Sequence, residues 1–131
     1  VVHLNQRVRD VLEMVGLLQR QRDLVRTFSR GMQQRLAIGR AVLHDPEVIL
    51  FDEPQTGLDQ EPSAMLDLVL QEVAARGRTV VMTSHDLSRV ADLASRFDII
   101  SNGSIAASIQ RSQINPNELL AFYRQSLRIS Q

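Results

Sequence analysis

Two short runs of consecutive apolar residues constrain the fold of this chain more than any other feature. Residues 48–51 read VILF and residues 79–83 read TVVMT, and residues 60–76 between them carry apolar side chains at helical spacing. A continuous apolar run of this length is typical of a strand buried on both faces of a parallel sheet. Two such strands joined by a helix predict an α/β fold, with a mostly parallel sheet and flanking helices.

Amphipathic helices are expected on both sides of these strands. Apolar residues at i, i+3, i+4 and i+7 predict a helix over residues 4–15, and Ser29 suits the N-cap of a helix over residues 30–44. Gly39 in that second helix costs about 1 kcal/mol relative to alanine, which indicates close packing there. Further helices are expected at residues 60–76, with Asp59 as N-cap, after His85, and from Pro116 onwards.

The C-terminal part of the chain predicts a third strand and a hairpin. Residues 97–101 are expected to form that strand, and Asn102-Gly103 is a strong signal for a tight turn, so residues 104–109 are expected to pair back. Residues 115–118 resemble a capping box with proline at the first helical position. The final helix is expected to place four residues on one face: Leu119, Leu120, Tyr123 and Leu127.

Composition excludes several classes of protein. The 15 basic and 15 acidic residues cancel, so no net field draws the chain to nucleic acid or to an anionic membrane. The absence of cysteine rules out disulfides and cysteine-based metal sites, and the three histidines are too scattered for a histidine-based one. No apolar run reaches the roughly 20 residues of a membrane span. Apolar residues make up 44% of the chain, enough for a core, which argues against disorder.

Polar side chains with catalytic potential follow the first two predicted strands. Asp52 and Glu53 come after the first strand and His85 after the second, so all three are expected along one edge of the sheet, where ligands bind in such folds. Asp52 suits Mg²⁺, held directly or through water, and Glu53 suits a residue that orients or deprotonates an attacking water. His85 can donate a hydrogen bond to a phosphate oxygen. Taken singly, these residues also fit an acidic turn and a structural histidine.

The loop before the second predicted helix reads FSRGM, residues 28–32. Ser29 offers a hydroxyl, Gly31 allows a close backbone approach, and the helix that follows presents its positive end, which together suit a phosphate. Taken alone, S-x-G before a helix indicates simple N-capping more often than a phosphate site. A nucleophilic role for Ser29 is not supported, because no G-x-S-x-G elbow surrounds it.

Four segments occur in a fixed order along the chain: FSRGMQQRLAIGRAVLHDP at 28–46, VILFDEP at 48–54, TGLD at 56–59 and TSHD at 83–86. This ordered set resembles the C-terminal half of the ATP-binding cassette (ABC) ATPases, a P-loop NTPase fold, over about residues 1–110. The family's signature loop usually reads L-S-G-G-Q. Ser29 and Gly31 match it, whereas Arg30 and Met32 depart from its first glycine and its glutamine. The SRGM variant is similar to that of some exporters, including haem exporters of cytochrome c maturation and certain drug or polysaccharide exporters.

The resemblance implies a role for each matching residue. Asp52 would be the aspartate on Mg²⁺, Glu53 the catalytic carboxylate that polarises water, and His85 the switch residue at the γ-phosphate of ATP. Asp59, with Gly57 and Leu58, would form the loop that communicates across a dimer. The signature loop, formed by Ser29, Gly31 and Met32, would contact the γ-phosphate of the ATP held by the opposite subunit.

The resemblance also implies a function. It predicts ATP hydrolysis that energises transport across a membrane, with ATP and Mg²⁺ bound and with export favoured over import. The expected partners are an integral membrane permease, whose coupling helix would sit near residues 1–28, and a second ATPase subunit in a head-to-tail dimer; no nucleic acid is expected. The expected location is cytoplasmic, at the inner face of the cell membrane. The alternatives are a soluble ABC ATPase outside transport and a non-catalytic interaction module.

One element of the family is missing from the sequence. A P-loop reads G-x-x-x-x-G-K-[ST], yet none of the six glycines begins such a motif and all 15 basic residues are arginine. We therefore expect the chain to be the C-terminal portion of a longer ATPase and to be inactive alone. Its expected division is the end of a helical signature subdomain at 1–45, part of a nucleotide-binding core at 46–110 and a C-terminal helix or tail at 111–131.

Overall fold

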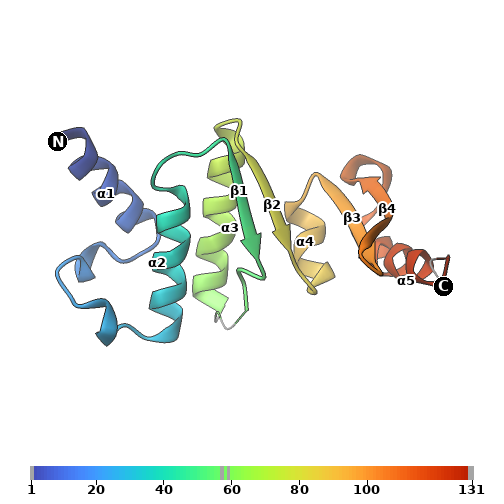
Figure 1. Ribbon diagram of the computed structural model, residues 1–131, viewed down its shortest axis with the longest axis horizontal. Helices are drawn as coiled ribbons and strands as arrows, with labels where there is room; N and C mark the ends of the chain where they lie inside the picture. Colours follow the sequence, from blue (N-terminus) through green and yellow to red (C-terminus); the bar gives the residue numbers. More distant parts are fainter. Residues whose placement is uncertain (1, 57, 59, 130–131) are drawn as a thin grey trace. The chain divides into compact units, whose positions relative to one another are not determined.

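The computed structural model describes residues 2–56, 58 and 60–129 and divides the chain into two compact units, Val1–Ser84 and His85–Gln131. Each unit has its own two-stranded sheet with helices packed on it (Figure 1). The α/β class predicted from the sequence is confirmed. The division expected at residues 45 and 110 stays a prediction.

The first unit contains all the helices and strands predicted for it. They are α1 (Val2–Met14), two short 3-10 turns (Leu18–Arg20 and Val25–Thr27), α2 (Arg30–Val42), β1 (Val48–Asp52), α3 (Gln60–Ala75) and β2 (Thr79–Thr83). Proline and glycine residues follow two of these helices, as the sequence predicts. Pro46 follows α2, and Gly77 adopts a φ of 76° between α3 and β2, a conformation that costs a glycine little.

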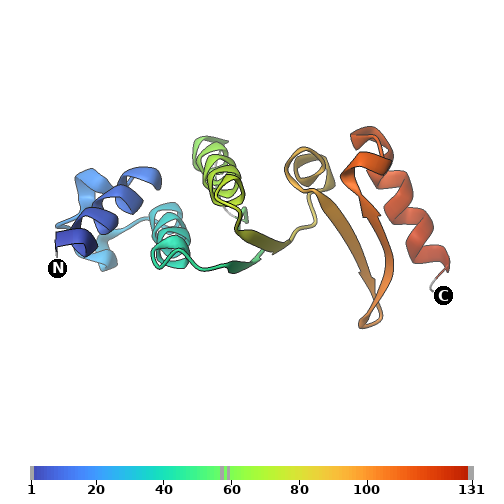
Figure 2. The same cartoon turned by 90° about the horizontal axis from the view of Figure 1, so that it is seen from above.

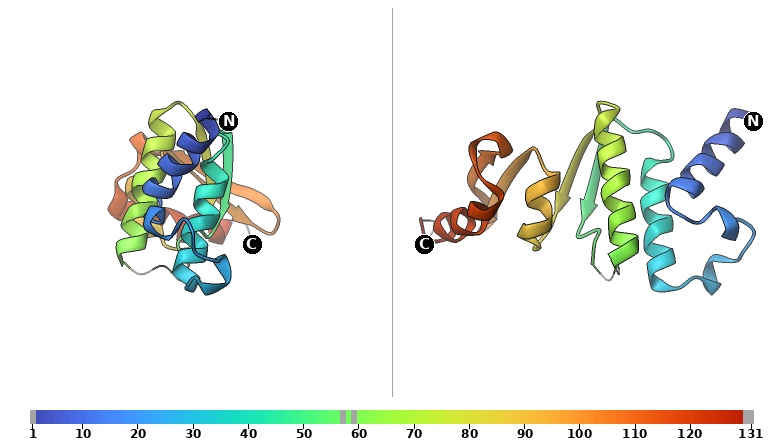
Figure 3. Two further views of the ribbon diagram at one scale, coloured as in Figure 1. Left: turned by 90° about the vertical axis from the view of Figure 1, so that its left-hand side faces the viewer. Right: turned by 180° about the vertical axis from the view of Figure 1, so that it is seen from behind.

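Strands β1 and β2 pair in parallel, in a register that runs from Val48 opposite Thr79 to Asp52 opposite Thr83. Helix α3 connects them and lies over one face of the pair (Figures 2 and 3). Ile49 of β1 and four residues of α3 are buried and belong to the core of the unit; the four are Leu66, Val69, Leu70 and Val73. The βαβ unit read from the sequence is therefore confirmed.

The other face of the β1–β2 pair is exposed. Val48 is 54% exposed, Leu50 74% and Val81 52%. The expectation that both faces of these strands are buried is therefore wrong for the part of the chain that the structure describes. The reason is that the helices of this unit are layered on one side of the strands, and a parallel strand is buried twice only between two such layers.

Helices α1 and α2 pack closely at Gly39. A β-carbon added there would lie 3.2 Å from Cγ1 of Val11 and 3.4 Å from Cγ2 of Val15, and both valines are buried. The first distance is shorter than an ordinary van der Waals contact, so a side chain at this position would require Val11 to move by a few tenths of an ångström. This confirms the close packing that a glycine inside a helix indicates.

The second unit is a hairpin with helices. It consists of α4 (Leu87–Leu93), β3 (Arg96–Ser101), β4 (Ser104–Gln110), two 3-10 turns (Arg111–Gln113 and Pro116–Glu118) and α5 (Leu119–Ile129). Strands β3 and β4 pair antiparallel, joined by Asn102 and Gly103 with φ of 50° and 76°. Both positive values fit a tight hairpin turn, which confirms the hairpin. Among the described residues β3 pairs with β4 rather than with the parallel strands.

Helix α5 begins as the sequence predicts, and the first of its two adjacent leucines is buried. The capping box of Asn115 and Glu118 is formed, with Pro116 at the first position. Leu119 is 1% exposed and Leu120 is 45% exposed, so of these two neighbours only Leu119 is buried. Successive residues point about 100° apart around a helix, and α5 packs against α4 and β4 through the side that carries Leu119.

Candidate functional site

The last residues of the two parallel strands form a hydrogen-bonded group. Asp52 ends β1 and Thr83 ends β2, and the two are register partners. The Thr83 hydroxyl donates to Oδ1 of Asp52 over 2.5 Å and accepts from the backbone N–H of Glu53 over 3.0 Å. Both Asp52 and Thr83 are exposed. The carboxyl end of the sheet thus presents a carboxylate whose orientation is fixed from the neighbouring strand.

Glu53 occupies an unusual backbone conformation. Its φ is 45°, in the left-handed region that residues other than glycine seldom adopt. Its carbonyl accepts from the backbone N–H of Thr56 over 3.0 Å, so a tight turn with Pro54 inside it follows the strand. Strained residues of this kind cluster at functional sites. The turn makes Glu53 the residue at which the chain leaves the sheet edge.

The turn after Glu53 is tied to helix α2. Nε2 of Gln34 donates to the carbonyl oxygen of Pro54 over 3.1 Å, and Pro54 is buried. Gln34 lies in the second turn of α2, the helix that begins just after Ser29. The helix and the strand-end turn are therefore linked directly by a side chain.

Ser29 caps α2, as predicted. Its Oγ accepts from the backbone N–H of Met32 over 3.3 Å, and both Ser29 and Arg30 are exposed. A β-carbon added to Gly31 would meet nothing within 4 Å, and its φ is not positive. Neither packing nor backbone conformation in this chain requires glycine there. Ser29, Gly31 and Met32 form a second group, at the start of α2, apart from the hydrogen-bonded group of Asp52, Glu53 and Thr83.

His85 begins the second unit and is exposed. Its neighbour Asp86 caps α4 by accepting from the backbone N–H of Arg89 over 3.2 Å and from the hydroxyl of Ser88 over 2.7 Å. These bonds, the Ser88 bond first, lower the pKa of the Asp86 carboxyl. Each unit is described by itself, so the grouping of His85 with the two strand-end acids stays a prediction. Asp59 and Gly57 lie outside the described residues, and their roles stay predictions as well.

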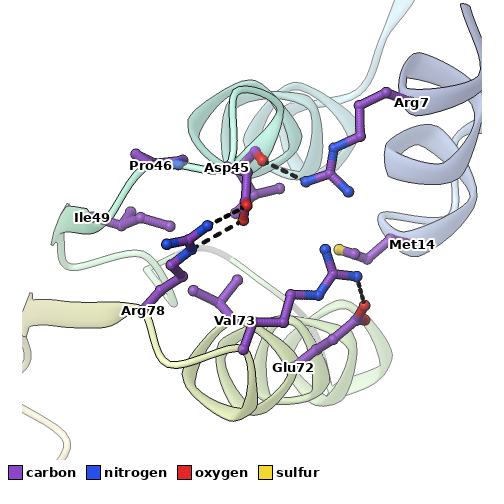
Figure 4. Close-up of a pocket in the computed structure, with 10 residues that line it drawn as sticks. Arg7, Met14, Asp45, Pro46, Ile49, Glu72, Val73 and Arg78 are labelled. Carbon is purple, nitrogen blue, oxygen red and sulfur yellow. Dashed lines mark hydrogen bonds and ion pairs between the residues drawn. The ribbon is translucent and has the colours of Figure 1, made fainter. Parts of the chain in front are cut away.

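The opposite end of the sheet holds charged residues that neutralise one another (Figure 4). Arg78, just before β2, makes two bonds to the Asp45 carboxylate, Nη2 to Oδ2 over 2.5 Å and Nε to Oδ1 over 3.3 Å. The hydrogen bond from Arg78 holds the pKa of Asp45 below its ordinary value of 3.8. Arg7 donates to the carbonyls of Val42 and Leu43 at the end of α2, over 3.0 and 3.2 Å. The cavity among these residues is about 10 Å³, enough for one water at most.

The strand-end group fits a magnesium ion that arrives with a nucleotide. In the described part of the chain no cluster of three histidine, aspartate or glutamate side chains is placed to hold a metal. Mg²⁺ does not need such a cage, because it is usually held by one or two carboxylates together with substrate phosphates and water. Asp52 meets that requirement, being exposed and oriented by Thr83.

Comparison with known proteins settles the family. The profile of the ABC transporter family matches residues 3–56, which include Ser29, Asp52 and Glu53. The linearmycin resistance ATP-binding protein LnrL of Bacillus subtilis is 38% identical over 102 residues, covering 78% of this chain and 33% of that protein. The chain belongs to the ABC transporter family of ATP-binding proteins. The resemblance read from the four ordered segments is thereby confirmed.

A further curated relative and a solved structure of the ABC family are also similar to this chain. The fluoroquinolones export ATP-binding protein of Mycobacterium tuberculosis is 36% identical over 97 residues, covering 74% of this chain and 32% of that protein. A solved structure of an ATP binding subunit of an ABC transporter superposes with a TM-score of 0.80 at 26% identity, covering 94% of this chain and 55% of that one. The chain spans about a third of the length of these two curated relatives. The similarity to haem exporters stays a prediction.

One further property bears on how this ABC chain relates to a membrane. Among the helices of residues 2–56 and 60–129, none is both long and apolar enough to cross a bilayer.

Proposed function

We propose that these residues are part of the ATPase subunit of an ABC transporter, in which ATP hydrolysis drives a substrate across a membrane. The observation that carries the proposal is the strand-end group, in which Thr83 orients Asp52 and Glu53 opens a strained turn. Relatives named for resistance and export favour an exporter. Because the sequence contains no P-loop, the activity is proposed for the complete cassette, meaning these residues joined to a segment that supplies one.

The side chains of the strand ends supply the chemistry. Asp52 would hold Mg²⁺ together with the phosphates of ATP, and the ion would neutralise charge on those phosphates. Glu53 would orient the attacking water with its carboxylate and accept a proton from it. His85, exposed just beyond β2, would donate a hydrogen bond to an oxygen of the γ-phosphate. The proposed role of the carboxyl end of the sheet is therefore to bind ATP and hydrolyse it.

The start of α2 would serve a second ATP, held by the opposite subunit of a head-to-tail dimer. The helix presents its positive end and the Ser29 hydroxyl, and the open space around Gly31 allows a phosphate to approach the backbone. Met32 would complete this loop, and Asp59 would lie in the segment that communicates between the two sites. The Gln34 bond to Pro54 connects the two sites through one helix.

The first 28 residues are the proposed docking region for the coupling helix of a membrane permease. Large apolar side chains of the described residues are exposed there: Leu4 at 57%, Val8 at 36%, Leu24 at 58% and Val25 at 51%. A permease that docks here would hold the cassette at the inner, cytoplasmic face of the cell membrane. A soluble ABC ATPase or a non-catalytic interaction module would need no such partner.

The decisive experiment replaces the proposed catalytic carboxylate in the complete cassette. Glu53→Gln is expected to lower ATP turnover by about 10²–10⁴-fold, because it removes the group that accepts the proton of water. ATP binding is expected to persist, so a nucleotide-bound dimer should accumulate in analytical ultracentrifugation. Glu47→Gln is the matched control, since Glu47 precedes the same strand at the other end of the sheet.

The outcomes separate the candidates. Turnover of Glu53→Gln within a few-fold of the unchanged protein would rule out the assigned role of Glu53. A complete cassette that binds a partner but shows no ATPase activity at all would support the interaction module instead. Activity without any membrane partner after purification from cells would favour the soluble ABC ATPase.

A further inference from the structure

We propose that Thr83 is a positioning residue for both strand-end acids, and that its hydroxyl sets the Mg²⁺ affinity of Asp52 and the alignment of Glu53. The inference rests on the proposed function of these two acids. It adds a residue to which neither the sequence pattern nor the comparisons give a role. The residue lies outside the strand that carries the acids, at the end of the neighbouring one.

The Thr83 hydroxyl is used in both of its capacities. A hydroxyl has one proton to donate and two lone pairs to accept with. Here the proton goes to Oδ1 of Asp52 over 2.5 Å, the length of a hydrogen bond to a charged carboxylate. One lone pair accepts from the N–H of Glu53 over 3.0 Å. A single side chain therefore contacts two consecutive residues of the adjacent strand.

The strand ladder, rather than a loop, places this hydroxyl. Asp52 and Thr83 are the last register partners of β1 and β2, so their side chains leave the same face of the sheet side by side. Threonine also suits the position as a β-branched residue with few side-chain rotamers. The spacing between hydroxyl and carboxylate is therefore fixed by backbone hydrogen bonds along the whole pair of strands.

The bond to Asp52 has a direct consequence for a bound cation. An exposed aspartate has several rotamers open to it, and the Thr83 bond holds the carboxylate in one orientation while leaving lone pairs for a ligand. Outer-shell partners of this kind typically change metal affinity or activity by about 10–100-fold when they are removed. Thr83 is expected to act on Mg²⁺ in the same way.

The bond to Glu53 acts on the other acid. The ladder of β1 ends at Asp52, so the N–H of Glu53 is paired by the Thr83 hydroxyl instead of by a strand. At Glu53 the φ of 45° bends the chain out of the sheet. Without the hydroxyl the strained bend loses the bond that holds its beginning, and the alignment of Glu53 is expected to change.

Three substitutions in the complete cassette test the proposal. Thr83→Val removes the hydroxyl with little change of shape, Thr83→Ser keeps it, and Thr79→Val makes the same chemical change on the same face of β2 at its other end. The assay is ATP turnover as a function of Mg²⁺ and of ATP. Thr83→Val is expected to raise the Mg²⁺ concentration for half-maximal turnover by about 10–100-fold and to lower kcat, with the KM for ATP at saturating Mg²⁺ little changed. Thr83→Ser should restore most of the loss, and Thr79→Val should match the unchanged protein.

A second measurement, amide hydrogen exchange, tests the role of Thr83 independently of ATPase activity. Hydrogen exchange of the Glu53 amide should be faster in Thr83→Val than in Thr79→Val, and Thr83→Ala serves if the valine variant does not fold. Normal Mg²⁺ dependence and kcat in Thr83→Val, with Glu53→Gln inactive, would overturn the inference and leave the proposed function intact. Unchanged exchange at Glu53 would overturn it whatever the function. Full activity of Glu53→Gln would instead overturn the proposed function.

Discussion

The two ends of the β1–β2 sheet use charged residues to opposite effect. At the end where the strands begin, Asp45 is paired with Arg78, and Arg7 binds the last carbonyls of α2 (Figure 4). At the end where they finish, Asp52 is held by a neutral hydroxyl. An arginine neutralises a carboxylate as it fixes it, whereas a hydroxyl fixes it and leaves its charge. Only the second arrangement suits the binding of a cation.

The largest expected effect contrasts the two aspartates. In the complete cassette, Asp52→Asn should reduce Mg²⁺-dependent ATP turnover to background, because an amide is a much poorer magnesium ligand than a carboxylate. Asp45→Asn makes the same change at the opposite end and should leave turnover unchanged. The measurement is steady-state ATPase activity over a range of Mg²⁺. Equal losses of turnover in Asp52→Asn and Asp45→Asn would contradict the functional difference between the two ends of the sheet.

A smaller effect is expected at the link between α2 and the strand-end turn. Gln34→Ala removes the hydrogen bond to the buried Pro54, at a cost of about 1 kcal/mol in the free energy of unfolding. Because the turn begins at Glu53, kcat should fall as well, though less than in Thr83→Val. Chemical denaturation and ATPase assays measure the two quantities. Gln71→Ala, on the exposed side of α3, is the control and should change neither.

The smallest effect is expected at the Asp45–Arg78 pair. Exposed ion pairs contribute little to stability, so Arg78→Met should lower the melting temperature only slightly and leave turnover unchanged. The pair depresses the pKa of Asp45 below 3.8. The contribution of the pair to the free energy of unfolding is therefore fully present above pH 3.8. It is lost as the pH falls through the lower pKa that Asp45 has in the folded state.

The pH dependence gives this prediction its test. Melting curves of the unchanged protein and of Arg78→Met are compared from about pH 7 down to about pH 2. The difference between them should shrink only in the acid part of the range. Asp86 and Asp98 also have lowered pKa values, through hydrogen bonds from Ser88 and Ser108. Their effect on stability is the same in both proteins and cancels in the difference between the two melting curves. A difference that is constant with pH would contradict the assigned ion pair.

The sequence predicts what depends on local signals. The cap at Ser29, the strand that begins at Val48 and the hairpin turn at Asn102-Gly103 each follow from a few neighbouring residues, and the structure confirms them. The order of the motifs also identifies the family. Local chemistry and motif order together account for most of the fold and for the acids of the candidate site.

The remaining features depend on contacts that a sequence pattern does not specify. An apolar run such as VILF does not say how many of its faces are covered, so the exposure of Leu50 could not be predicted. Two adjacent leucines at the start of α5 fit the helical period about equally, and packing against the hairpin selects Leu119. A role for Thr83 does not follow from the sequence alone, because it depends on the strand register that places Thr83 beside Asp52. A polar residue that ends an otherwise apolar strand is the signal that points to it.

The exposed face of β1 and β2 also matters outside the reaction. Val48, Leu50 and Val81 present branched apolar side chains to water, each more than half exposed. Surfaces of this kind are what chaperones bind and what promotes aggregation when a chain is incompletely folded. Chaperones and proteases recognise such surfaces, so they influence how much of this protein accumulates in a cell. Its abundance in a cell will follow how well that face is covered, independently of whether its carboxylates are competent for catalysis.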